Sequence, residues 1–119
     1  MVTIYGINNC DTVKKARKQL EKQGVDYQFH DFRKDGLDSK VVNQWIKDLG
    51  VDTLVNKRSR TWKELNEKQQ ASLMGAKAAD LIVKNPTLIK RPLLEVGNNK
   101  ANIQRFVGYD QKQYLALFS

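Results

Sequence analysis

The stretch YGINNCDTVKKAR, residues 5–17, contains the single cysteine of the chain, Cys10. It overlaps a run of β-branched and aromatic residues at 2–7 (VTIYGI), which predicts a buried strand. From Asp11 onward, apolar residues recur at helical spacing among lysines and arginines, which predicts an amphipathic helix. Those apolar positions are Val13, Ala16 and Leu20. We therefore expect Cys10 at the junction between a strand and the helix that follows it.

The residues after this helix complete a βαβ unit. Gly24 stands where a C-terminal helix cap is expected, and residues 26–32 (DYQFHDF) resume strand character. Two strands that flank one helix in this way are expected to be parallel, with a right-handed crossover.

The remaining sequence predicts helices first and a hairpin later. Asp38 or Ser39 can cap a helix that ends at Gly50, and residues 51–85 indicate two or three short helices. The later elements are a strand at 93–96, a turn at 96–100 (VGNNK), a strand at 101–107 and a helix at 110–118. This order predicts an α/β, thioredoxin-like fold. We expect one domain over residues 1–119, with a helical insertion at about 39–85 between the βαβ unit and the closing ββα unit.

The composition favours a small protein of a reducing compartment. With 119 residues and one cysteine, the chain forms no internal disulfide. It has no signal-peptide pattern at its start and no apolar run of about 18 residues, so we expect a cytoplasmic monomer with no membrane association. The net charge of +8 is spread along the chain without a nucleic-acid-binding signature. It indicates a solvated surface that attracts anions.

The predicted position of Cys10 favours a reactive thiol. A helix N-terminus offers free backbone N–H groups and the positive end of the helix dipole, and both stabilise a thiolate. The alternative is an ordinary buried cysteine, but such a residue normally lies within a strand. Cys10 instead follows Asn8 and Asn9, which are typical of a loop.

The chain offers Cys10 no internal redox partner. Three positions further on stands Val13, so there is no C-x-x-C motif, and an oxidised Cys10 needs an external thiol such as glutathione or a glutaredoxin. His30 is the only histidine and is expected to be structural or exposed. One cysteine and one histidine are a poor ligand set, so we expect neither a metal nor a bound cofactor.

IKRP, residues 89–92, is the second informative stretch. Pro92 restricts Arg91 to extended geometry at the entry to a strand, and the bond between them is a candidate cis peptide. A plain loop proline beside a surface arginine is the alternative interpretation.

Together these stretches resemble the arsenate reductase (ArsC) family, in the branch that includes the YffB and Spx proteins. The resemblance covers nearly the whole chain, and GINNCDTVKKA with FHDFRKDGLDS is especially similar to the YffB proteins, which are described as glutathione-dependent thiol reductases. It rests on YGINNCDTVKKAR, RSRTWKEL at 58–65, PTLIKRPLL at 86–94 and FVGYD at 106–110.

The resemblance implies a nucleophilic thiol at Cys10 and a cis proline at Pro92. It also implies oxyanion-binding arginines, and the RS pattern of the YffB and Spx proteins selects Arg58 over Arg60. The residues expected to bind substrate are Arg91, Arg58, Arg105, Asn8 and Asn9.

The function implied is that of a monothiol oxidoreductase. The Cys10 thiolate would attack an oxyanion or a glutathione mixed disulfide, and glutathione or a glutaredoxin would regenerate it. One alternative is an Spx-like transcriptional regulator that binds RNA polymerase, although such a sensor usually switches through an intramolecular disulfide. The other is a binding domain with an idle thiol.

Overall fold

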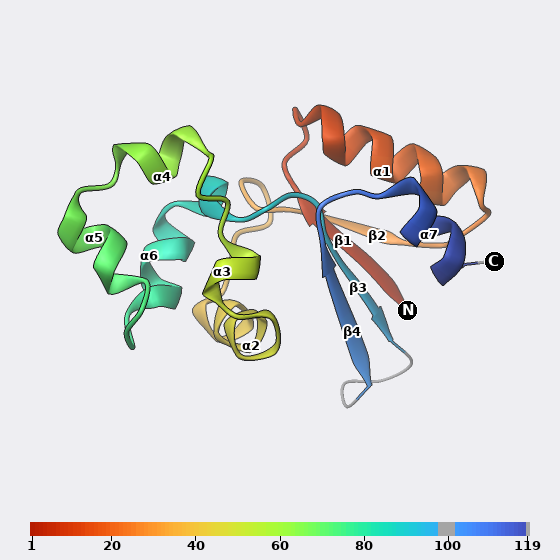
Figure 1. Cartoon of the computed structure of the whole chain (residues 1–119). Helices are drawn as coiled ribbons and strands as arrows, with labels where there is room; N and C mark the ends of the chain where they lie inside the picture. Colours follow the sequence, from red (N-terminus) through yellow and green to blue (C-terminus); the bar gives the residue numbers. More distant parts are fainter. Residues whose placement is uncertain (98–101, 119) are drawn as a thin grey trace. The chain divides into compact units, whose positions relative to one another are not determined.

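Figure 1 shows the computed structural model of the chain, which describes residues 1–97 and 102–118. Contacts between residues divide the chain into two compact units. One unit combines Met1–Asp35 with Arg91–Ser119 and contains the β-sheet, and the other is the helical segment Gly36–Lys90.

The sheet unit contains four strands and two helices among its described residues. In chain order these are β1 (Val2–Gly6), α1 (Asp11–Lys22), β2 (Gln28–Asp31), β3 (Leu93–Gly97), β4 (Ile103–Val107) and α7 (Gln111–Leu117). Their order across the sheet is β2-β1-β3-β4, with β1 and β2 parallel as predicted and the other pairs antiparallel. Strand β2 is shorter than the predicted strand at 26–32.

One face of the sheet packs against α1 and α7, as Figure 1 shows. Ile4 of β1 and Leu94 of β3 lie on this face and are fully buried. They contact Ala16 and Leu20 of α1 and Tyr114 of α7, also fully buried. The apolar stripe read from residues 13–20 is therefore the face by which α1 covers the sheet.

Side chains alternate between the two faces of a strand, so the neighbours of these core residues point the other way. Tyr5, Glu95 and Arg105 form a polar network on that second face. The two strand faces thus separate an apolar core from a polar group of contacts.

The ends of three strands meet at one edge of the sheet. Gly6 ends β1, Asp31 ends the parallel strand β2, and the antiparallel strand β3 begins at Leu93 beside Tyr5. The loop that contains Cys10 and the dipeptide Arg91–Pro92 both adjoin this edge. The topology therefore brings two segments about 80 residues apart in sequence to the same end of the sheet.

The helical unit contains more helices than the sequence predicts. Within residues 51–85, all of which are described, there are four short α-helices where two or three are expected. Short helices carry weak periodicity, so their caps are the better signal. The unit comprises α2 (Ser39–Leu49), α3 (Val51–Leu54), α4 (Arg60–Glu64), α5 (Glu67–Ser72), α6 (Ala78–Lys84) and the 3₁₀ helix η1 (Pro86–Leu88).

Local capping explains where several helices begin. Asp38 accepts a hydrogen bond from the backbone N–H of Lys40 and caps α2, as predicted. Asn66 and Gln69 form a reciprocal capping box at α5, and Asp110 caps α7. Most of the predicted VGNNK turn lies outside the described residues.

Candidate active site

Cys10 occupies the N-cap position of α1, at the end of a tight turn. Its backbone N–H donates to the carbonyl oxygen of Ile7 at 3.3 Å, which makes Asn8 and Asn9 the two central residues of the turn. Both asparagines are exposed and Cys10 is partly exposed, with no hydrogen bond from its side chain to the helix. Cys10 therefore lies at the N-terminus of α1, where the first N–H groups have no partner within the helix itself.

Gly6 allows α1 to start close to the end of β1. A Cβ atom at Gly6 would lie 2.7 Å from Cγ2 of Val13, far inside van der Waals contact. Val13 is 1% exposed and belongs to the first turn of α1, three residues after the cysteine. The glycine thus sets how closely the turn that carries Cys10 approaches the sheet.

Asp31 holds this turn from the neighbouring strand. One carboxylate oxygen, Oδ2, accepts the backbone N–H of Asn8 at 3.3 Å. The other, Oδ1, accepts the N–H groups of Arg33 at 2.8 Å and Lys34 at 3.3 Å. Asp31 is 4% exposed, and this burial raises the pKa of its carboxyl, but the backbone donors outweigh the burial and leave the pKa below its ordinary value.

Asp31 was not among the residues expected at the site. Its only sequence signal is an acidic residue at the end of a predicted parallel strand, next to the strand that leads to Cys10. Its contact with Asn8 joins residues 23 positions apart and depends on the pairing of Gly6 with Asp31. That pairing follows from strand register, which residue type alone does not specify.

Arg91 and Pro92 lie immediately before β3, and the peptide bond between them is cis. Pro92 is buried, and its carbonyl oxygen accepts the N–H of Gly108 at 2.9 Å. Within the described part of the chain, Nη1 of Arg91 is buried without a hydrogen-bond partner. A buried guanidinium N–H that lacks an acceptor is costly, and an anion supplies the acceptor it needs.

Arg105 is engaged within the sheet. Its Nε donates to Oε2 of Glu95 at 2.7 Å, and the two side chains are 9% and 14% exposed. Tyr5 donates its hydroxyl to the other oxygen of Glu95 at 2.9 Å. Burial and the negative charge of Glu95 raise the pKa of Tyr5. An anion that approaches Arg105 would have to compete with this carboxylate.

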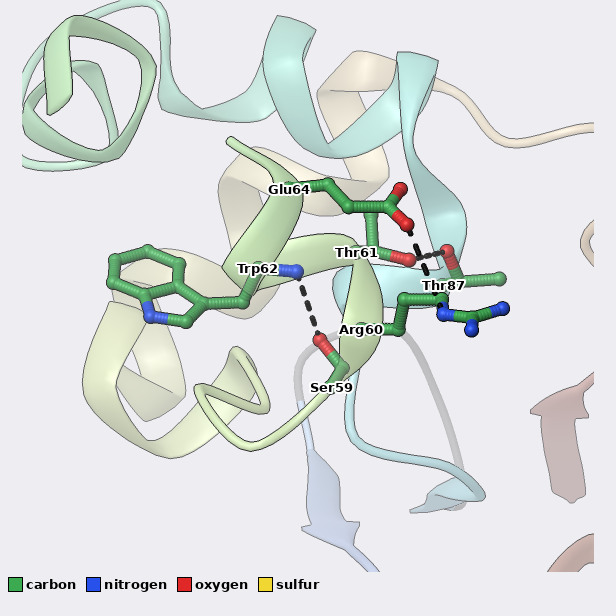
Figure 2. A network of polar contacts seen from close by, with 6 residues as sticks. All are labelled: Ser59, Arg60, Thr61, Trp62, Glu64 and Thr87. Carbon is green, nitrogen blue, oxygen red and sulfur yellow. Dashed lines mark hydrogen bonds and ion pairs between the residues drawn. The ribbon is translucent and has the colours of Figure 1, made fainter. Parts of the chain in front are cut away.

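Arg58 and Arg60 belong to the helical unit, and both are exposed. The backbone N–H of Arg58 donates to Oδ1 of Asn56 at 3.0 Å, which holds the chain in a turn before α4. Figure 2 shows the start of α4, where the side chain of Ser59 caps the helix by accepting from the N–H of Trp62. Arg60 lies 3.8 Å from Glu64, and both side chains are largely exposed.

His30 lies on β2, with its ring 4.9 Å from the ring of Tyr5. No cluster of three metal-ligating side chains occurs among residues 1–97 and 102–118. Nor does any helix in those ranges have the length and apolarity needed to cross a membrane.

A βαβ unit followed by a ββα unit around a four-stranded mixed sheet defines a thioredoxin-like α/β protein, which confirms the predicted fold class. The ArsC family profile matches residues 5–117, and the chain belongs to the ArsC family. This confirms the resemblance read from the sequence.

Relatives and solved structures agree with this assignment. The solved structure of the YFFB (PA3664) protein is 37% identical to this chain and superposes over 100% of both chains with a TM-score of 0.89. An arsenate reductase (ArsC) related protein from Brucella melitensis is 39% identical, with a TM-score of 0.73 over 99% of this chain and 94% of the other. The global transcriptional regulator Spx of Listeria innocua is 31% identical over 90% of this chain and 87% of its own length.

Proposed function

We propose that this protein is an arsenate reductase-like monothiol oxidoreductase with Cys10 as its nucleophile. Its substrate is an oxyanion such as arsenate or a glutathione mixed disulfide, and glutathione or a glutaredoxin returns Cys10 to the thiol. The observation that carries the proposal is the buried Nη1 of Arg91, which has no hydrogen-bond partner among the described residues and lies at the end of the sheet to which the Cys10 turn is attached.

Chemistry supports this pairing of a thiol with an arginine. A thiolate at a helix N-terminus is stabilised by backbone N–H groups, and a guanidinium binds a tetrahedral oxyanion through charge-assisted hydrogen bonds. Arg91 would therefore hold an anion, or the carboxylate of a glutathione moiety, while Cys10 attacks. The free thiol suits a reducing compartment such as the cytoplasm.

With a glutathione mixed disulfide as substrate, the Cys10 thiolate attacks the glutathione sulfur and forms a Cys10–glutathione disulfide, while the other sulfur leaves as a thiolate. A glutathione thiolate then attacks the mixed disulfide, releases Cys10 and leaves as oxidised glutathione. With arsenate, Cys10 and one glutathione supply one electron each. Arsenate is reduced to arsenite, water is the other product, and Cys10 is left in a disulfide with glutathione. A second glutathione attacks this disulfide, releases the Cys10 thiol and forms oxidised glutathione. Both cycles need external thiols, since the chain has no second cysteine.

The remaining predicted ligands keep their roles as part of the proposal. Arg58 is the second oxyanion arginine, and Arg60 serves as its charge-matched comparison. Arg105 is the third arginine, and an anion bound there competes with Glu95, which already accepts a hydrogen bond from it. Asn8 and Asn9 are exposed in the turn before the thiol and would contribute polar contacts to substrate.

The test is the rate of alkylation of Cys10 by iodoacetamide as a function of pH, repeated with arsenate and with oxidised glutathione. We expect rapid alkylation near neutral pH, protection by arsenate, and a Cys10–glutathione adduct detectable by mass spectrometry. Cys10→Ser should abolish the adduct and all reductase activity. Slow alkylation that neither reagent changes would refute the proposal and make the thiol idle.

The Listeria innocua relative, a global transcriptional regulator, supports a second candidate function, that of a transcriptional regulator. We propose RNA polymerase as its partner in that case. Specific capture of RNA polymerase by the purified protein, lost in a charge-reversed variant, would favour it. The lack of an internal cysteine pair counts against a switch based on an intramolecular disulfide.

A further inference from the structure

The carboxylate of Asp31 joins two loops that both leave the same end of the sheet. Oδ1 accepts the N–H groups of Arg33 and Lys34 and shapes the turn after β2. Oδ2 reaches across to the N–H of Asn8, in the turn that leads to Cys10. One side chain therefore fixes the loop after β2 relative to the loop before α1.

The chain reinforces this arrangement around Asp31 itself. The N–H of Asp31 donates to Oδ2 of Asp35 at 2.9 Å, and the N–H of Asp35 donates to the carbonyl of Asp31 at 2.8 Å. In addition, the N–H of Phe32 donates to the carbonyl of Gly6 at 2.9 Å, which extends the β1–β2 pairing to the start of the Cys10 turn. Asp31 is thus held in place from both directions, and its carboxylate offers the N–H of Asn8 a fixed acceptor.

Both oxygens of Asp31 accept backbone N–H groups. An aspartate can satisfy all of these donors, whereas an asparagine cannot. An asparagine has one acceptor oxygen and one NH₂ donor. If its oxygen keeps the two donors Arg33 and Lys34, its NH₂ group faces the N–H of Asn8, and that contact becomes repulsive.

We propose that Asp31 is the positioning residue for Cys10. Through the N–H of Asn8 it fixes the Ile7–Cys10 turn, and thereby the place from which the thiol meets its substrate. The inference rests on the proposed function of Cys10, but the link between Asp31 and Asn8 can be measured separately. A purely structural role, confined to the turn at 31–35, would leave Asn8 and the thiol unaffected.

The first measurement uses the unmodified protein. In NMR spectra recorded against pH, the amide signal of Asn8 should shift with the same midpoint as the carboxyl carbon of Asp31. This measurement uses the wild-type protein, so its result does not depend on whether a variant folds. An Asn8 amide that is insensitive to the protonation of Asp31 would overturn the proposal.

The second measurement compares Asp31→Asn with Asp110→Ala. Asp110 also accepts the N–H of the residue two positions later, Lys112, so its loss removes a similar contact far from Cys10 along the chain. We expect Asp31→Asn to speed amide exchange at Asn8 and to raise the arsenate concentration that half-protects Cys10 by roughly tenfold, because misplaced reacting groups are costly. Asp110→Ala should change neither quantity.

The outcomes separate the two proposals. If arsenate and oxidised glutathione leave Cys10 of the wild-type protein unaffected, the proposed function fails, and exchange at Asn8 still decides whether Asp31 holds the turn. If the wild-type protein responds and Asp31→Asn responds equally, the proposed function stands and the positioning role is refuted.

Discussion

Two arginines of the sheet unit, Arg91 and Arg105, have opposite electrostatic surroundings. Arg105 lies at the centre of β4, the outer strand beside β3, and its Nε is 2.7 Å from a carboxylate oxygen of Glu95. Arg91 lies at the end of the sheet, where Nη1 is buried and no acceptor among the described residues reaches it. The family resemblance implies an oxyanion-binding role for both arginines. Only the fold shows that the charge of Arg105 is already balanced by a carboxylate. The capacity to bind an anion therefore depends on the partner of a guanidinium as much as on its presence.

The largest effect is expected at the ion pair between β3 and β4. Arg105→Gln removes the guanidinium that lies 2.7 Å from Glu95, in a place where both side chains are nearly buried. We expect a loss of about 2 to 3 kcal/mol in the free energy of unfolding, measured by urea denaturation, because removal of one partner leaves an uncompensated charge. The double variant Glu95→Gln with Arg105→Gln should recover much of this loss. Unchanged stability in the single variant would mean that the salt bridge is not structural.

Gly6, at the end of β1, is a position where side-chain volume matters. Gly6→Ala places a methyl group 2.7 Å from Cγ2 of Val13, and overpacking of this kind costs about 1 to 3 kcal/mol. We also expect Cys10 to be alkylated at a different rate, since the start of α1 has to move. In the matched control, Gly6→Ala is combined with Val13→Ala to relieve the contact. If the double variant is no closer to wild type in alkylation rate than Gly6→Ala, the close approach does not position Cys10.

The sequence was informative wherever the signal was local. The run of β-branched and aromatic residues at 2–7 and the helical spacing from Val13 to Leu20 both indicate their secondary structure locally, so the junction at Cys10 could be predicted. Asp38 as a helix cap was predictable for the same reason, because a cap contacts the N–H two or three residues later.

Contacts that depend on strand register could not be predicted in this way. Asp31 reaches Asn8 because β2 pairs with β1 in one register, and Glu95 lies opposite Arg105 because the hairpin closes in one register. A shift of one residue would send each side chain to the other face of the sheet. The underestimated number of short helices has another origin, since α5 is marked by its Asn66–Gln69 capping box more clearly than by its apolar periodicity.

Protection of Cys10 by arsenate measures how much each of the two arginines contributes to anion binding. Arg91→Ala should raise the arsenate concentration that half-protects Cys10 from alkylation by roughly tenfold, the effect of one lost charge-assisted hydrogen bond. Arg60→Ala removes the same charge from an exposed side chain and serves as the control for general electrostatic attraction. We expect Arg105→Gln to have a smaller effect than Arg91→Ala, because Glu95 already neutralises Arg105. Equal effects would show that Arg105 reaches the anion in spite of its carboxylate partner.

The smallest effect concerns acid stability. Although burial opposes ionisation, the backbone donors lower the pKa of Asp31 below its ordinary value, so its stabilising contribution is complete above the pKa of the unfolded chain, about 3.9. It is lost as the pH falls through the lower, folded-state value. The difference in free energy of unfolding between wild type and Asp31→Asn should therefore shrink as urea denaturation is repeated from pH 6 to below about pH 4. The corresponding difference for Gly6→Ala, an uncharged substitution at the same end of the sheet, should stay constant. A constant difference for Asp31→Asn as well would mean that its carboxylate does not hold the two loops through its charge.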